Sequence, residues 1–171
     1  MTKQLSFEIE AGAICAVEEA AIGAFAHVGL GDEMQADRAA IAHMHAVLAE
    51  LAMSGHVVFG EGDEYESALL FDGEKLGQGG LECDIALDAL EGTTLAAKAM
   101  QNALSVIAIS PKGGLLRVPD IYMDKIAIGP NFPQGIIDLD KSTRFDCRIA
   151  RNWRKSLLDS RWRCRRRDIY H

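Results

Sequence analysis

The sequence has few aromatic residues and no long apolar run, and both absences narrow what the chain can be. Phe, Trp and Tyr make up 6% of its 171 residues, whereas hydrophobic residues make up 49%, so its core is built from Ala, Leu, Ile and Val. No apolar stretch approaches the roughly 18 residues that a membrane-spanning helix needs, and the first residues show no signal peptide. We therefore expect a cytoplasmic protein without a membrane partner.

Cysteine is also scarce. The four cysteines, Cys15, Cys83, Cys147 and Cys164, are scattered and include no C-x-x-C pair. A zinc site or a disulfide framework is therefore not expected, and free thiols fit a reducing compartment.

Lys and Arg are scarce over most of the chain. Residues 1–141 contain 8 Lys or Arg against 22 Asp or Glu, whereas residues 142–171 contain 10 against 3. An acidic body disfavours nucleic acid as the main partner and is compatible with metal cations. We expect two segments: a folded body over 1–141, and a basic tail over 142–171 that is disordered or the product of a frameshift.

Hydrophobic periodicity predicts two helices followed by a run of strands. The first helix is expected over about residues 7–27, and the second from Ala36, with Asp37 in its first turn, to a break near Ser54-Gly55. This order indicates an α+β fold, with two N-terminal helices packed on a mostly antiparallel sheet. Strands are expected at 56–59, 68–71, 84–88, 104–109, 115–118 and 122–128, and a short helix at 94–100.

Four acidic residues stand where these elements begin or end: Asp37, Glu61, Asp88 and Glu91. Magnesium and manganese prefer hard oxygen ligands, usually a few carboxylates completed by water and substrate phosphate. Asp88 and Glu91 follow one predicted strand and Glu61 follows another, so together they can surround a cation. Taken singly, each is weak evidence, because most acidic residues are solvated surface groups.

The segment Gly92-Thr93-Thr94 suggests a second kind of chemistry. Backbone N–H groups at the start of a helix bind phosphate oxygens, and a Thr hydroxyl beside a metal can orient an attacking water. The alternative is a purely structural helix cap, for which Thr is a common choice. The residues alone favour the cap.

Several segments, in order, resemble a known family. Residues 88–94, Asp-Ala-Leu-Glu-Gly-Thr-Thr, resemble the D-P-[IL]-[DE]-G-T metal motif of the lithium-sensitive phosphatases, which include the inositol monophosphatases. The other segments resemble motifs of class II fructose-1,6-bisphosphatases in particular. They are Gly31-Asp32 with Ala36-Asp37, Val57–Gly62, Gly73–Gly77, Asn102–Ala108 and Pro119–Pro130.

The resemblance implies a two-metal site that flanks the scissile phosphate. By motif position, Asp37 and Glu61 hold one Mn²⁺ or Mg²⁺, and Asp88 and Glu91 hold the other. Bound there, the metals polarise phosphoryl oxygens and generate a hydroxide-like nucleophile.

The resemblance also implies catalytic and substrate-binding residues. Thr93 matches a threonine that positions the attacking water, and Glu61 shares the catalytic role. Glu91, Gly92 and Thr93 match a substrate-contacting stretch, and Tyr122 matches a tyrosine that contacts substrate. The alternative for Tyr122 is an inward-facing aromatic residue of a strand.

The implied activity is hydrolysis of the 1-phosphate of fructose 1,6-bisphosphate to fructose 6-phosphate and phosphate, a step of gluconeogenesis. Sedoheptulose bisphosphate is the alternative substrate. The implied fold is the first domain of the αβαβα sugar phosphatase fold, with the second domain missing, and a homo-oligomer is possible.

Departures from the family motifs favour a divergent or relaxed member. Ala89 replaces the proline of the metal motif, which removes a fixed φ and can loosen the spacing of its carboxylates. Tyr65 replaces an acid, and Leu30 and Glu33 replace basic residues.

The loss of family pattern after Asp140 motivates a second hypothesis, a truncated, non-catalytic fragment or pseudoenzyme. A third hypothesis gives the Arg-rich tail around Trp162 an anion- or RNA-binding role; the alternative is a tail without function.

Overall fold

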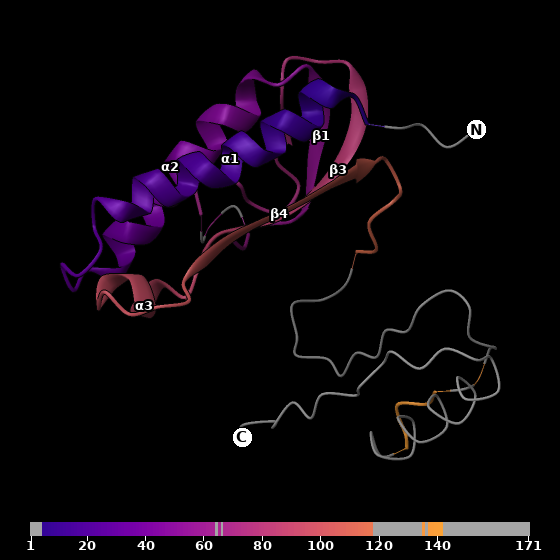
Figure 1. Cartoon of the computed structure of the whole chain (residues 1–171). Coiled ribbons are helices and arrows are strands. Elements are labelled where there is room, and N and C mark those ends of the chain that lie inside the picture. Colours follow the sequence, from indigo (N-terminus) through magenta and orange to yellow (C-terminus); the bar gives the residue numbers. More distant parts are fainter. Residues whose placement is uncertain (1–4, 64, 66, 118–134, 136, 142–171) are drawn as a thin grey trace, which may run out of the picture. The chain divides into compact units, whose positions relative to one another are not determined.

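Two long helices and a four-stranded sheet form the part of the chain that the structure describes (Figure 1). This computed structural model describes residues 5–63, 65, 67–117, 135 and 137–141. The chain divides into two units, Met1–Val118 and Pro119–His171, and the helices and strands described below belong to the first.

Helix α1 (Phe7–Phe25) confirms the first predicted helix. The side chain of Ser6 caps its N-terminus by accepting a hydrogen bond from the N–H of Ile9 at 3.3 Å. Small residues dominate the buried face, which lets α2 approach closely. The buried residues are Ile9, Gly12, Ala16, Ala20, Gly23 and Ala24.

Helix α2 (Glu33–Glu50) also follows the predicted periodicity, but both of its ends differ from the prediction. Asp32 caps its N-terminus, so Asp37 lies in the second turn and not in the first. The helix ends before Ser54 and Gly55, because those two residues belong to a strand. There, a Cβ on Gly55 would lie 2.7 Å from the end of the Ile85 side chain, so a larger residue would require Ile85 to shift.

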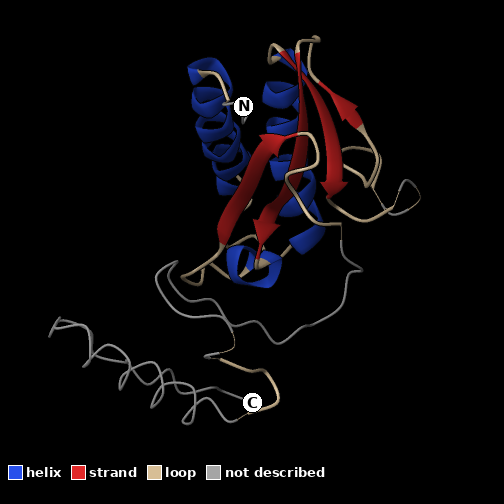
Figure 2. Cartoon of the chain, turned by 90° about the vertical axis from the view of Figure 1, so that its right-hand side faces the viewer, coloured by secondary structure: helices blue, strands red, loops and turns tan. Residues whose placement is uncertain are grey.

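The sheet is mixed, with strand order β2-β1-β3-β4. It consists of β1 (Met53–Phe59), β2 (Lys75–Leu76), β3 (Leu81–Glu91) and β4 (Leu104–Pro111). β1 is antiparallel to β2 and parallel to β3, and β3 is antiparallel to β4. The two long helices cover one face of this sheet (Figure 2), which confirms an α+β fold with a mostly antiparallel sheet.

Strand β3 contains a bulge near its end. Asp88 pairs with Val106 and Glu91 pairs with Leu104, so three steps along β3 match two steps along β4. A bulge bends its strand and leaves a residue out of the ladder. It therefore redirects the side chains at the end of β3.

Two of the predicted strands are wrong. Residues 68–71 form a loop, because Leu70 adopts a left-handed backbone with φ 58° and places a fully buried side chain in the core. Residues 115–117 form no strand either, and the N–H of Leu115 donates to Asp84 instead. The strand predicted at 122–128 lies outside the described residues.

The core lies between the helices and the sheet, and α3 (Thr93–Ala97) closes one end of it. The turn between α1 and α2 is fastened to α3, because Gly29 and Gly31 donate to the carbonyls of Ala96 and Ala97 at 3.0 and 2.9 Å. In the described part of the chain, no helix has the length and apolar character needed to cross a membrane.

Candidate active site

Four carboxylates reach the same edge of the sheet from three elements. Asp37 lies in the second turn of α2, Glu61 lies two residues after β1, and Asp88 and Glu91 lie at the end of β3. Because β1 and β3 are parallel, their carboxyl ends meet at one edge. The sheet topology therefore explains how residues so far apart in sequence become neighbours.

The charges of these carboxylates affect one another. Burial, together with the charges of Asp37 and Asp88, raises the pKa of Glu61 to about 7. Burial, together with a hydrogen bond to Glu91 and the charges of Glu91 and Asp37, raises the pKa of Asp88 to about 6. Burial also raises the pKa of Asp37, against the opposing effect of Arg38. The structure thus brings all four residues within electrostatic range.

A backbone hydrogen bond connects Glu61 to the bulge of β3. Glu61 Oε1 accepts from the N–H of Ala89 at 2.7 Å. Ala89 is fully buried, and a buried N–H needs such a partner. The proline of the motif that this segment resembles has no N–H to donate. The replacement by Ala89 therefore adds a link between the two carboxylate-bearing segments.

The loop that carries Glu61 is closed at its base by further hydrogen bonds. The N–H of Glu61 donates to the carbonyl of Leu70 at 2.9 Å, and the N–H of Gly60 donates to Asp72 Oδ1 at 2.7 Å. A Cβ on Gly60 would lie 2.0 Å from the Leu70 carbonyl, so this approach requires glycine. A hydrogen bond between His45 Nε2 and Glu74 Oε1, at 3.1 Å, joins the loop to α2.

The donor set fits a hard divalent cation. All four candidate ligands offer carboxylate oxygens, which suit Mg²⁺ or Mn²⁺. Burial and neighbouring negative charge raise the pKa values of Glu61 and Asp88, and a bound cation would offset that charge. Within the described residues, however, no three Asp, Glu, His or Cys side chains converge closely enough to form a ready metal-binding group. The fit therefore rests on donor chemistry and electrostatic proximity.

The other predicted residues lie beside this edge or beyond the described chain. Gly92, with φ 86°, is the N-terminal cap of α3, and no side chain caps this helix. The capping role expected for Thr is therefore wrong, and Thr93 is the first helical residue, directly after Glu91 and Gly92. Tyr122 lies outside the described residues.

A hollow of about 620 Å³ opens between α2 and the loop after β1, and it includes both Asp37 and Glu61. Its size is within the range of small-ligand sites. Arg38 also lines it, a residue that the sequence analysis missed. The signal was present in the helical spacing of Met34, Arg38 and Ile41, which places all three on one face. The remaining lining residues are Tyr65, Ser67, Ala68 and Leu69.

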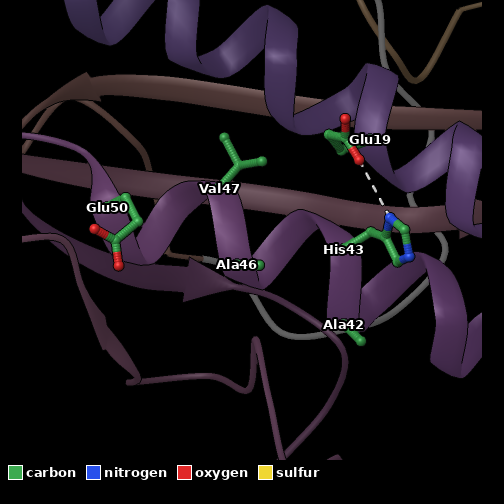
Figure 3. Close-up of a pocket in the computed structure, with 6 residues that line it drawn as sticks. All are labelled: Glu19, Ala42, His43, Ala46, Val47 and Glu50. Carbon is green, nitrogen blue, oxygen red and sulfur yellow. Dashed lines mark hydrogen bonds and ion pairs between the residues drawn. The ribbon is translucent and has the colours of Figure 1, made fainter.

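A second hollow lies between α1 and α2 (Figure 3). His43 Nδ1 pairs there with Glu19 Oε2 at 3.2 Å, and both side chains are nearly half exposed. Glu50 lies further along α2, and Ala46 and Val47 lie between it and His43. An exposed pair of this kind contributes little stability, and the hollow brings together no catalytic group of residues.

A known protein family matches most of this chain. Residues 8–159 match the family model described as bacterial fructose-1,6-bisphosphatase, glpX-encoded. This chain belongs to that family. The matched range includes the four carboxylates, Thr93 and Tyr122.

Curated relatives of the fructose-1,6-bisphosphatase family agree with this match. The chain is 42% identical to fructose-1,6-bisphosphatase 1 class 2 of Escherichia coli K12 over 72% of this chain and 37% of that protein. It is 40% identical to fructose-1,6-bisphosphatase class 2 of Haemophilus influenzae over 83% of this chain and 43% of that protein. A Synechococcus sp. (strain JA-3-3Ab) relative, named D-fructose 1,6-bisphosphatase class 2/sedoheptulose 1,7-bisphosphatase, is 40% identical over 82% and 43%. The chain thus spans about two fifths of the length of these relatives.

Proposed function

We propose that this chain contributes the metal-binding part of an enzyme that hydrolyses the 1-phosphate of fructose 1,6-bisphosphate, releasing fructose 6-phosphate and phosphate. One observation carries the proposal: a member of the fructose-1,6-bisphosphatase family gathers four carboxylates at one edge of its sheet. Sedoheptulose 1,7-bisphosphate is a second candidate substrate, because the Synechococcus relative is named for both activities.

The carboxylates are assigned in two pairs. Asp37 and Glu61 would hold one Mn²⁺ or Mg²⁺, and Asp88 and Glu91 would hold another. When bound, such cations would offset the gathered negative charge and act as Lewis acids toward phosphoryl oxygens.

The chain's own groups would position the reactants. The Thr93 hydroxyl orients the attacking water, and Glu91, Gly92 and Tyr122 contact the substrate. Glu61 would share the catalytic role as a carboxylate beside the attacking water, since a ligand of a bound cation stays deprotonated. The water oxygen forms a bond to phosphorus while the bond from phosphorus to the sugar oxygen breaks.

Phosphate release from fructose 1,6-bisphosphate tests this proposal, measured with the full 171-residue chain in the presence of Mn²⁺ or Mg²⁺. We expect metal-dependent release that falls at least about 100-fold in Glu61→Gln and in Asp88→Asn, because both changes remove charge without changing shape. Glu82→Gln is the matched control: Glu82 is an exposed carboxylate of the same strand β3, paired with Lys112 at 2.7 Å. It should release phosphate at the unaltered rate.

Two results would contradict the proposal in different ways. Undiminished release by Asp88→Asn would disprove the assignment of the carboxylates. Failure of the unaltered chain to release phosphate with either metal would reject catalysis by this chain and favour a non-catalytic, metal-binding role.

A further inference from the structure

Arg38 occupies an unusual position in the hollow between α2 and the loop after β1. It is the only cation among the described residues that line this hollow, and it shares the lining with the carboxylates Asp37 and Glu61. Its side chain is exposed, and the described residues provide no hydrogen-bond or ion-pair partner for its guanidinium. Its charge nevertheless acts on Asp37, so the two groups lie close together.

Positive charge from the protein would add to that of any bound metal in holding a phosphate ester in this hollow. The two basic residues of the motif that the start of α2 resembles are replaced here by Leu30 and Glu33. Arg38 lies five residues after Glu33 on α2 and lines the hollow. The chain therefore retains a cation next to the carboxylates, but at a different position.

We propose that Arg38 is a substrate-binding residue that pairs with a phosphate group of the sugar bisphosphate, a role that rests on the proposed function above. A guanidinium offers parallel N–H donors that match two phosphate oxygens, and these charge-assisted hydrogen bonds are among the strongest in proteins. With no other partner among the described residues, the Arg38 donors are available to the ligand. Met34 and Ile41 line the hollow beside it, on the same face of α2.

Binding measurements test this role without depending on turnover. Isothermal titration of the full chain, with Mg²⁺ present, would give the dissociation constants of inorganic phosphate and of fructose 1,6-bisphosphate. We expect Arg38→Gln to weaken the binding of both anions about tenfold, because it removes a charge-assisted pair that is partly open to water. Arg38→Lys, which retains the charge but not the two parallel donors, should fall between Arg38→Gln and the unaltered chain.

Lys112→Ala is the matched control. It removes the same formal charge at the opposite end of β3, where Lys112 pairs with Glu82 on the surface, and it should leave anion binding unchanged. Titration with Mg²⁺ alone provides the second readout. If Arg38 only balances the charge of Asp37, Arg38→Gln will change metal affinity and leave phosphate affinity as it was, which would overturn the proposal.

The outcomes separate this inference from the proposed function. Phosphate binding that depends on Arg38, in a chain that releases no phosphate from the bisphosphate, supports the inference and rejects catalysis. Lack of phosphate binding by the unaltered chain, or equal weakening in Arg38→Gln and Lys112→Ala, overturns the inference even if the chain hydrolyses the bisphosphate.

Discussion

Glu61 shows how one residue can combine structural and chemical roles. Its backbone N–H closes the loop after β1, one carboxylate oxygen accepts from Ala89, and burial raises its pKa to about 7. The folded chain thus stabilises the position of this side chain while disfavouring its charge. This conflict has a measurable consequence for stability.

Without divalent metal, the free energy of unfolding should fall as pH rises from 5 to 8. The pKa values of Glu61 and Asp88 in the folded chain, about 7 and about 6, lie above their ordinary values of 4.5 and 3.8. The folded state therefore holds more protons in this range, and stability is lost as both groups ionise. Because both are partly exposed, we expect a total loss on the order of 1–2 kcal/mol.

Urea unfolding in a chelating buffer, followed by circular dichroism at several pH values, measures this slope. Glu61→Gln should reduce the slope and leave the part due to Asp88, since an amide of the same shape does not ionise there, whereas the Glu82→Gln control should keep the full slope. An unchanged slope in Glu61→Gln would show that another group is responsible. Added Mn²⁺ should stabilise the unaltered chain more at pH 8 than at pH 5.

At the scale of the elements, glycines set the distance between α1 and α2. A Cβ on Gly12 would meet only the flexible end of Leu51, at 2.4 Å. A Cβ on Gly23 would lie 2.7 Å from the backbone carbonyl of Ala39 and 2.9 Å from the ring of His43. The helices can accommodate a methyl group at the first position more easily than at the second.

Gly23→Ala should therefore destabilise the chain more than Gly12→Ala does. Both substitutions gain about 1 kcal/mol of helix propensity, but only Gly23→Ala must push a backbone group aside, which typically costs about 1–3 kcal/mol. Thermal unfolding of the two variants, compared with the unaltered chain, gives the order. Equal melting temperatures for the two variants would show that the helices are not held at this distance.

The elements also show what the sequence could predict. Both long helices follow from apolar spacing and caps, because their buried faces repeat every three to four residues. The apolar run 68–71 looked like a strand, yet Leu70 turns left-handed and acts as a single anchor in the core. A four-residue apolar run shows too little periodicity to distinguish a strand from a loop with one buried residue.

Only part of the candidate site, likewise, could be predicted from the sequence. Motif resemblance indicated the four carboxylates, and the parallel pairing of β1 with β3 supplied the reason why they meet. The bond between Ala89 and Glu61 was beyond sequence reasoning, because it joins residues 28 positions apart through a tertiary contact. Arg38 was missed because an arginine beside an aspartate on a helix looks like an ordinary surface residue.

At the scale of the whole molecule, the reactivity of a buried cysteine reports whether the centre of the sheet stays closed. Cys83 lies in β3 and is 1% exposed, and burial and the charge of Asp84 raise the pKa of its thiol. Cys15, on α1, is exposed. Since the thiolate is the reactive form, these two residues should differ sharply in reactivity.

We expect iodoacetamide to modify Cys15 in the native chain at least about 100-fold faster than Cys83, which becomes reactive only when the unit Met1–Val118 unfolds. Mass spectrometry of the separated peptides resolves these two cysteines from Cys147 and Cys164. In concentrated guanidinium the two rates should converge. Modification of Cys83 at the rate of Cys15 under native conditions would show that the sheet opens locally.

The hydrogen bond from Ala89 to Glu61 has one further consequence. A proline ring restrains its own segment at all times, whereas a hydrogen bond exists only while both segments keep their places. The amide proton of residue 89 is therefore a built-in reporter. Its exchange with solvent deuterium would register, at a single position, whether the carboxylate after β1 and the pair at the end of β3 are in place together.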